Sequence, residues 1–263
     1  MNSNTLLLQC NSWSDFKERV ALLNTTKEKG DCFEALTKYF LTLNPKYTTQ
    51  LKTVWHHSET PTRVRELLNL PGQDLGIDLV AKAHSGEYWA IQCKYKDDES
   101  STLTWNDLST FIGLSFSHCR NITLGLVCTS ADRQSSNLKK LHADKLSFCA
   151  GDVWRDLDAD FFDRLHAYLE GKLKPYEPKS PRPHQQRAID NAYEHFVEQD
   201  EKRGKLIMPC GTGKSLAAFW IFQRLDADTV LVAMPSLALV RQTLEVWTRE
   251  MTAQNISANW ICV

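Results

Sequence analysis

One segment of the chain combines glycine, lysine and serine in a pattern suited to holding phosphate. Residues 208–215 read Met-Pro-Cys-Gly-Thr-Gly-Lys-Ser. Gly211 and Gly213 allow a tight turn with inward-facing amides, because they carry no Cβ. These amides and the N-terminus of a following helix present partial positive charge. Lys214 adds a full charge and the Ser215 hydroxyl can ligate Mg²⁺, so the segment predicts binding of a nucleoside triphosphate.

A second group of residues has the types needed for metal-dependent cleavage of a phosphodiester. It consists of Asp78 and, fourteen residues on, the pair Gln92 and Lys94. Cleavage needs a divalent cation that polarises the phosphate and activates water. It also gains from a positive group near the developing charge. An acid on one strand, with an amide and a lysine on the next, supplies these requirements.

Hairpin geometry tests whether these residues can meet. A three-residue loop at positions 84–86 pairs Ala83 with Glu87, which sets Asp78 opposite Gln92 with Lys94 farther along the same face. The opposite face is then nearly all apolar and comprises Ile77, Leu79, Ala81, Ala83, Glu87, Trp89, Ile91 and Cys93. A two-residue turn would put Asp78 on that apolar face. Hydrophobic pattern and chemistry therefore select the same register.

The elements that would position this pair follow the order helix, three strands, helix, strand, with additions at both ends. Helical periodicity covers residues 13–23, 33–43 and 105–118, and strand character covers 47–55, 77–83, 87–95 and 122–129. A helix at 136–143 and a strand at 146–150 complete the series. This order predicts an α/β domain over residues 1–169.

Residues 170–182 read as a linker, because prolines at 175, 178 and 181 alternate with basic residues. Beyond it, helices are predicted at 183–198, 214–225 and 236–248. Strands are predicted at 205–208 and 229–234. Alternating strands and helices indicate a parallel sheet covered on both faces.

Composition excludes a strongly basic protein. The chain has 263 residues, a net charge of −1 and eight cysteines without a CxxC pair. We expect reduced thiols, no membrane span and a cytoplasmic protein. Any nucleic-acid contact must come from a local patch. The candidate basic residues are Arg63, Arg65, Lys139, Lys140, Lys145, Lys172, Lys174, Lys179 and Arg182.

The phosphate segment, with Met208 in place of the usual glycine, resembles the first motif of superfamily 2 helicases and translocases. Residues 183–185 (Pro-His-Gln) are similar to the upstream glutamine motif of that superfamily, and residues 231–242 to the next motif downstream. The resemblance implies ATP as ligand. It would be contacted by Gln185, Gly211, Thr212, Gly213, Lys214 and Ser215.

The acidic pair that should follow is absent between Ser215 and Val263. We therefore expect the N-terminal part of a longer protein, which by itself binds ATP weakly and does not turn it over.

The Asp78 and Gln92-x-Lys94 arrangement resembles the PD-(D/E)xK nucleases, in particular the Mrr-like branch. The resemblance implies Asp78 as principal metal ligand, Gln92 as neutral ligand or water-orienting group and Lys94 as catalytic lysine. Glu34 on the preceding helix would be an accessory acid. Asp74 would be a loop residue that could substitute for Asp78.

Together the two halves resemble the start of single-chain Type ISP restriction enzymes. This implies a restriction-endonuclease-like αβββαβ nuclease over residues 1–169, a linker over 170–182 and a partial RecA-like parallel α/β ATPase domain over 183–263. It also implies Mg²⁺ or Mn²⁺, ATP, double-stranded DNA and further domains. Two alternatives remain: a helicase-nuclease without methylation, and a degenerate nuclease fold that only binds DNA.

Overall fold

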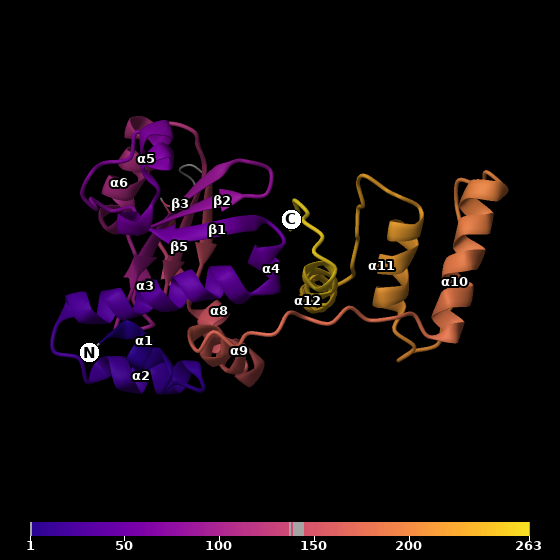
Figure 1. The fold of residues 1–263 in the computed structure, drawn as a ribbon, viewed down its shortest axis with the longest axis horizontal. Helices are drawn as coiled ribbons and strands as arrows, with labels where there is room; N and C mark the ends of the chain where they lie inside the picture. The colour runs from indigo at the N-terminus through magenta and orange to yellow at the C-terminus, as the bar shows by residue number, and fades with distance from the viewer. Residues whose placement is uncertain (1, 137, 139–144, 263) are drawn as a thin grey trace. The chain divides into compact units, whose positions relative to one another are not determined.

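The computed structural model describes residues 2–136, 138 and 145–262. They form two compact units (Figure 1). The first unit comprises the described residues up to Lys174 and those from Ala258 onward, and the second comprises Pro175–Ser257. The predicted helix at 136–143, with Lys139 and Lys140, falls largely outside the described residues. In the described part of the chain, no helix is long and apolar enough to cross a membrane.

The first unit is built on a mixed five-stranded sheet in the order β1-β2-β3-β5-β7. The strands are β1 (Leu51–His56), β2 (Leu79–Ala83), β3 (Tyr88–Lys94), β5 (Ile122–Thr129) and β7 (Leu146–Cys149). The first three pair antiparallel, whereas β3, β5 and β7 pair parallel. A separate short parallel pair joins β4 (Thr102–Leu103) and β6 (Arg133–Gln134).

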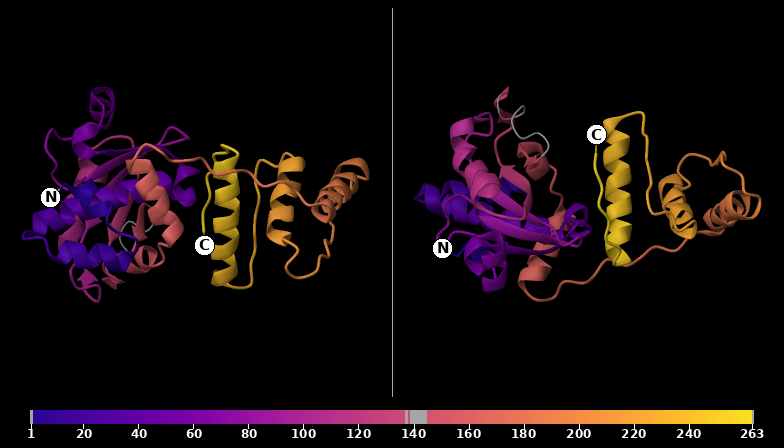
Figure 2. Two further views of the ribbon diagram at one scale, coloured as in Figure 1. Left: turned by 60° about the horizontal axis from the view of Figure 1, so that its bottom comes forward. Right: turned by 90° about the horizontal axis from the view of Figure 1, so that it is seen from above.

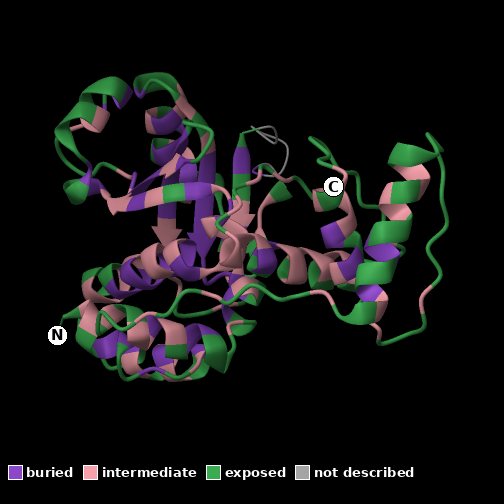
Figure 3. Cartoon of the chain, turned by 45° about the vertical axis from the view of Figure 1, so that its right-hand side comes forward, coloured by how far each residue is buried: buried purple, intermediate pink, exposed green. Residues whose placement is uncertain are grey.

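Helices cover both faces of this sheet (Figures 1 and 3). One face carries α1 (Ser3–Leu7), α2 (Trp13–Ala21), α3 (Thr26–Leu43), α8 (Gly151–Arg155) and α9 (Ala159–Leu169). The other carries α5 (Thr62–Leu68) and α6 (Trp105–Gly113), the latter continued by a π-turn at Leu114–His118. Short helical turns at Pro45–Thr48 (α4) and His57–Glu59 (η1) flank β1.

Each face of the sheet has its own hydrophobic core. The core under α3 includes Phe16, Phe33, Leu36, Leu79, Ile91 and Trp154, all buried. The core under α6 includes Leu68, Val80, Ala90, Leu108, Phe111 and Val127. Because both faces are covered, the central strands are apolar on both sides, as parallel strands in such sheets generally are.

Local signals in the sequence define α3, which carries one of the site residues. Thr25 and Glu28 form a capping box, in which the Thr25 hydroxyl accepts from the Glu28 amide at 3.1 Å and the Glu28 carboxylate accepts from the Thr25 amide at 3.1 Å. The helix ends at Leu43, because Asn44 precedes a proline and takes an extended conformation. The apolar stripe faces the sheet, and Glu34 flanks it.

The hairpin register is the predicted one. Leu79 lies opposite Ile91, and the Ala83 amide donates to the Glu87 carbonyl at 2.8 Å. The strand Ile122–Thr129 is also confirmed. The strand predicted for 47–55 is wrong in its first part, because Pro45 starts the α4 turn with the Asn44 side chain accepting from Lys46. Strand pairing therefore begins only at Leu51.

The second unit consists of three helices with extended connections. α11 (Lys214–Arg224) packs against both α10 (Pro183–Tyr193) and α12 (Leu237–Ala253), and a π-turn at Glu194–Glu198 extends α10 (Figure 2). Phe219 and Trp220 of α11 are buried in the small core of this unit. The predicted helices are confirmed.

The strands predicted at 205–208 and 229–234 are not formed. Both segments are extended but unpaired, and they leave Ile207 79% and Leu231 94% exposed. A parallel strand needs neighbours for its backbone donors and acceptors and cover on both faces. Within the described residues neither segment meets a partner strand, so apolar sequence alone does not make a sheet here.

Candidate metal site and phosphate loop

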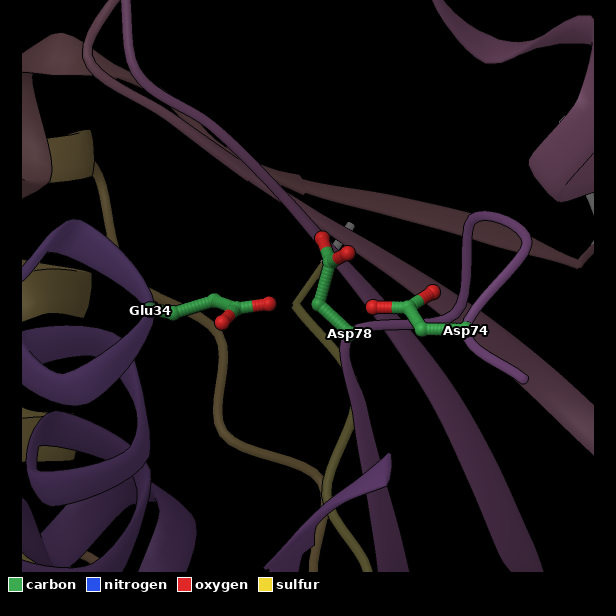
Figure 4. Close-up of side chains that lie close together, drawn as sticks. All are labelled: Glu34, Asp74 and Asp78. Carbon is green, nitrogen blue, oxygen red and sulfur yellow. The ribbon is translucent and has the colours of Figure 1, made fainter. Parts of the chain in front are cut away.

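Three carboxylates meet at one end of the sheet. Glu34 comes from α3, Asp74 from the loop after α5, and Asp78 from the residue before β2, with Asp78 between the other two (Figure 4). One oxygen of each lies within 4.8 Å of the others. Three such groups at this distance repel one another unless a proton or a cation lies among them.

Asp78 is fixed by both neighbouring strands. Its amide donates to the Ile91 carbonyl at 3.0 Å, and its carbonyl accepts from the His57 amide at 2.8 Å. Its carboxylate accepts from the backbone amide of Cys93. The backbone and side chain of Asp78 are therefore held between β1 and β3, with the second carboxylate oxygen left for another partner.

Asp74 lies on a loop braced by an arginine. Its carboxylate accepts from the Gly76 amide at 2.8 Å. The Arg65 guanidinium donates to the carbonyls of Thr60 at 3.2 Å, Pro71 at 3.1 Å and His57. Arg65 therefore ties the loop before Asp74 to the end of β1. The guanidinium therefore already has partners in the protein backbone, and its contact with DNA stays a prediction.

Gln92 and Lys94 approach the carboxylates from β3. Gln92 is 3% exposed, and its side-chain oxygen has no hydrogen-bond partner among the residues that the structure describes. Its amide nitrogen lies against Gly76, only 3.5 Å from the place of a Cβ on that residue, where φ is +127°. Lys94 is close enough to Asp78 for its charge to lower the carboxyl pKa.

The expectation of one shared strand face holds only for Gln92 and Lys94. Asp78 precedes β2, where Gly76 interrupts the extended chain, so the alternation of the strand does not set its direction. For the same reason Ile77 joins the core under α6, whereas Leu79 joins the core under α3. Asp78 instead turns its carboxylate toward Glu34 and Asp74 (Figure 4).

Electrostatics at this cluster favour a proton or a cation. Burial, followed by the charges of Asp78 and Asp74, raises the pKa of Glu34 to about 8. Burial also raises the pKa of Asp78 to about 6, although the Cys93 amide and Lys94 oppose the rise. The interaction between the two side chains raises the pKa of Glu34 and lowers that of Asp78, so Glu34 is the carboxyl that holds a proton more readily. Oxygen ligands of this kind suit hard divalent cations.

The phosphate loop opens α11. Gly211 and Gly213 have φ of +76° and +79°, which glycine adopts without strain. The Lys214 ammonium donates to the carbonyls of Met208 at 3.2 Å and Pro209 at 3.4 Å. The Ser215 hydroxyl accepts from the Trp247 indole at 3.1 Å. The loop thus has the predicted turn and helix, although the strand before it is missing.

Gln185 is the buried residue behind this loop. It is 4% exposed, its side-chain oxygen accepts from the Arg182 amide at 2.8 Å, and its amide nitrogen donates to the Thr212 carbonyl at 3.0 Å. A cavity of about 380 Å³ lies beside it. The lining residues are Lys179, Ser180, Arg182, Gln185, Gly211, Thr212, Gly213, Leu216 and Trp220.

Two features of these sites were not predicted from the sequence: the place of Asp74 beside Asp78, and the place of Lys179 and Ser180 in the cavity. Asp74 was predicted to be a loop residue that could only replace Asp78, yet it lies beside Asp78. The signal was an Asp two residues before Gly76, a spacing at which the carboxylate binds a backbone amide. Lys179 and Ser180 were predicted to be linker residues, yet they line the cavity. Their sequence gave no signal for that position.

Comparisons with known proteins identify both units. Residues 42–150 match the family model described as "Restriction endonuclease" (Mrr_cat_2). Residues 178–260 match the model described as "Type III restriction enzyme, res subunit" (ResIII). The first unit is therefore similar to restriction endonucleases, and the second to the helicase-like region of Type III restriction enzymes.

A solved structure combines the same two parts. The chain is similar to the structure titled "ATP-dependent Type ISP restriction-modification enzyme LlaBIII bound to DNA", with 25% identity and a TM-score of 0.60. The similarity covers 91% of this chain and 15% of that one, so this chain spans a small part of the length of the Type ISP enzyme. A search of curated proteins found no match. The predicted resemblance to Type ISP restriction enzymes is confirmed.

Proposed function

We propose that this chain is the metal-dependent DNA endonuclease module of an ATP-dependent translocating restriction enzyme, joined to the ATP-binding start of its motor. Residues 1–169 would be the nuclease, 170–182 the linker and 183–263 the motor segment. The observation that carries the proposal is the meeting of three carboxylates near the charge of Lys94. Gln92, two residues before Lys94 on β3, has a buried side-chain oxygen without a hydrogen-bond partner among the described residues.

A divalent cation fits the residues at this site. Glu34, Asp74 and Asp78 offer carboxylate oxygens within 4.8 Å of one another. Gln92 offers a neutral oxygen that no group in the described part of the chain satisfies. Mg²⁺ takes such oxygen ligands together with water. A bound cation would polarise the scissile phosphate and lower the pKa of an attacking water.

Three residues of the chain would have separate roles in the cleavage reaction. Asp78 is held by the Cys93 amide and so would hold the cation in one position. Lys94 supplies a positive charge beside it for the charge that develops on the phosphate. Glu34, which carries a proton at neutral pH, would release that proton when a cation binds. The substrate would be duplex DNA, and the similar LlaBIII structure is described as bound to DNA.

The second unit would bind ATP. The glycine turn and the N-terminus of α11 favour phosphate, and Lys214 would leave the carbonyls of Met208 and Pro209 to reach it. The cavity beside Gln185 has a volume in the range of small-ligand sites. In the full-length enzyme, translocation would use this ATP. We expect this chain alone to bind ATP weakly without turnover.

The decisive assay is nicking of supercoiled plasmid with Mg²⁺ or Mn²⁺. We expect nicking by the wild-type chain, with loss in Asp78→Ala and Lys94→Ala and in the presence of a chelator. Asp31→Asn is the matched control, because Asp31 lies on α3 near Glu34 but outside the carboxylate group. If the wild-type chain binds the plasmid but does not nick it, the alternative of a degenerate nuclease fold that only binds DNA is favoured.

A further inference from the structure

The last part of the linker packs within the second unit. Residues 173–182 have no regular secondary structure, yet those from Pro175 onward belong to the compact unit that holds the phosphate loop. The Lys179 amide donates to both carboxylate oxygens of Glu250 on α12, at 3.0 and 3.3 Å. The Arg249 guanidinium lies 5.3 Å from the centre of the Tyr176 ring.

The buried Glu250 carboxylate fixes the linker to α12. Its side chain is 2% exposed, and the Gln254 side chain also donates to it at 2.8 Å. Hydrogen bonds to a carboxylate are stronger than those between neutral groups. A buried carboxylate that loses such a donor suffers a large desolvation penalty. The Lys179 amide is therefore held in one position relative to α12.

This attachment brings the linker to the nucleotide cavity. Lys179, Ser180 and Arg182 line the cavity of about 380 Å³ together with Gln185 and Gly211–Gly213. Two cationic residues therefore share the cavity with a turn that is itself suited to phosphate. The backbone amide of the same linker residue, Lys179, is bound to Glu250, which does not line the cavity.

We propose that Lys179 is a nucleotide-binding residue whose ammonium group contacts the anionic phosphates, so that nucleotide occupancy fixes the end of the tether to the nuclease. The inference rests on the proposed nucleotide binding. Because the Glu250 carboxylate holds the Lys179 amide while its side chain engages phosphate, bound nucleotide and α12 would both act on the linker. The conformation of the linker at Lys179 would then depend on whether nucleotide is bound.

Trypsin provides an internal comparison within the linker. Trypsin cleaves after lysine and arginine but not before proline, so the bonds after Lys174 and Arg182 resist it. The cleavable bonds are those after Lys172 and Lys179. We expect a non-hydrolysable ATP analogue to protect the bond after Lys179 and to leave cleavage after Lys172 unchanged. Equal rates after Lys179 with and without the analogue would overturn the inference.

Nucleotide affinity and coupling can be separated by substitution. Lys179→Ala should raise the analogue's Kd about 10-fold, as loss of one charge-assisted contact does, whereas Lys172→Ala should not change it. Glu250→Gln should lose the protection after Lys179 with little change in Kd. Glu245→Gln, on the exposed side of α12, is its matched control.

The outcomes distinguish the two proposals. Lys214→Ala should abolish binding of the analogue. If the wild-type chain binds no nucleotide, the proposed ATP site fails together with this inference. If the wild-type chain binds and Lys214→Ala does not, but Lys179→Ala binds like wild type, only the role of Lys179 is refuted. Thermal melting of each variant shows whether it remains folded.

Discussion

Asp74 offers the sharpest test of how the candidate site is charged. The strand position that would carry an acid in PD-(D/E)xK nucleases holds neutral Gln92, and Asp74 lies on the neighbouring loop. We predict that Asp74 supplies the missing charge. Asp74→Asn should therefore weaken binding of Mn²⁺, and Gln92→Glu in the same background should restore it, because Gln92 lies against Gly76, whose amide holds the Asp74 carboxylate.

The size of the effect follows from the spacing of the carboxylates. A cation among oxygens that lie within 4.8 Å of one another would be no farther than that from Asp74. At this distance, Asp74 and one unit of cation charge attract by about 3.5 kcal/mol at an effective dielectric of about 20 and by about 0.9 kcal/mol in water. Asp74 is solvent-exposed, so screening places its contribution between these limits. Because about 1.4 kcal/mol corresponds to a tenfold change, Asp74→Asn should raise the Kd roughly 10- to 100-fold.

Calorimetric titration with Mn²⁺ measures this directly. Asp31→Asn removes the same charge from an exposed position outside the carboxylate group and should change the Kd less than about 3-fold. The reasoning is refuted if Asp74→Asn binds Mn²⁺ like wild type. It is also refuted if Gln92→Glu fails to recover binding in a variant that melts at the wild-type temperature.

Three further predictions follow from the same contacts. Calorimetric titration with Mg²⁺ at pH 7 in buffers of different ionisation enthalpy should show release of about one proton, because the pKa of Glu34 is about 8. The affinity for Mg²⁺ should rise with pH up to that value. A binding enthalpy that is the same in all buffers would contradict the predicted proton release. Arg65→Ala should weaken Mn²⁺ binding as Asp74→Asn does, by loosening the loop; unchanged affinity would show that the brace is dispensable. Gly213→Ala should abolish nucleotide binding measured by calorimetry, since its Cβ would lie 2.5 Å from Gln185; wild-type affinity would contradict this.

The pKa shifts also predict how stability depends on pH in the metal-free chain. A carboxyl whose folded-state pKa is raised stabilises the fold fully below its unfolded value, and this contribution disappears as pH rises through the folded value. Glu34 and Asp78, with pKa values of about 8 and about 6, should therefore make the metal-free chain progressively less stable as pH rises from 3.8 to about 8. Chemical denaturation should show this loss, and Mn²⁺ should reverse it. In the control variant Glu34→Gln, the part of the loss above pH 6, beyond the range of Asp78, should disappear.

The hairpin shows how far sequence patterns reach. Apolar alternation and the loop length predicted its register, because a one-residue slip would move Asp78 onto the apolar face. The register of Leu79 with Ile91 agrees. The alternation could not predict the direction of Asp78 itself. That direction depends on Gly76, where the chain leaves the extended conformation just before β2.

Long-range contacts set the features that the sequence missed. Asp74 reaches Asp78 because Arg65 on α5 holds the loop in place. Its guanidinium donates to the carbonyl of Thr60 before this helix and to that of Pro71 after it. Lys179 reaches the cavity through Glu250, 71 residues later. The segments 205–208 and 229–234 have strand-like sequences, but strand formation depends on partners that the described chain does not bring to them.

The central claim is that a divalent cation binds among the carboxylates at the end of the sheet. Anomalous diffraction from crystals of the chain grown with Mn²⁺ tests it most directly. We predict a peak within ligand distance of the oxygens of Asp78 and Asp74, with the Gln92 oxygen turned toward it. A fully occupied Mn²⁺ site elsewhere, with these carboxylates sharing only a proton, would contradict the account.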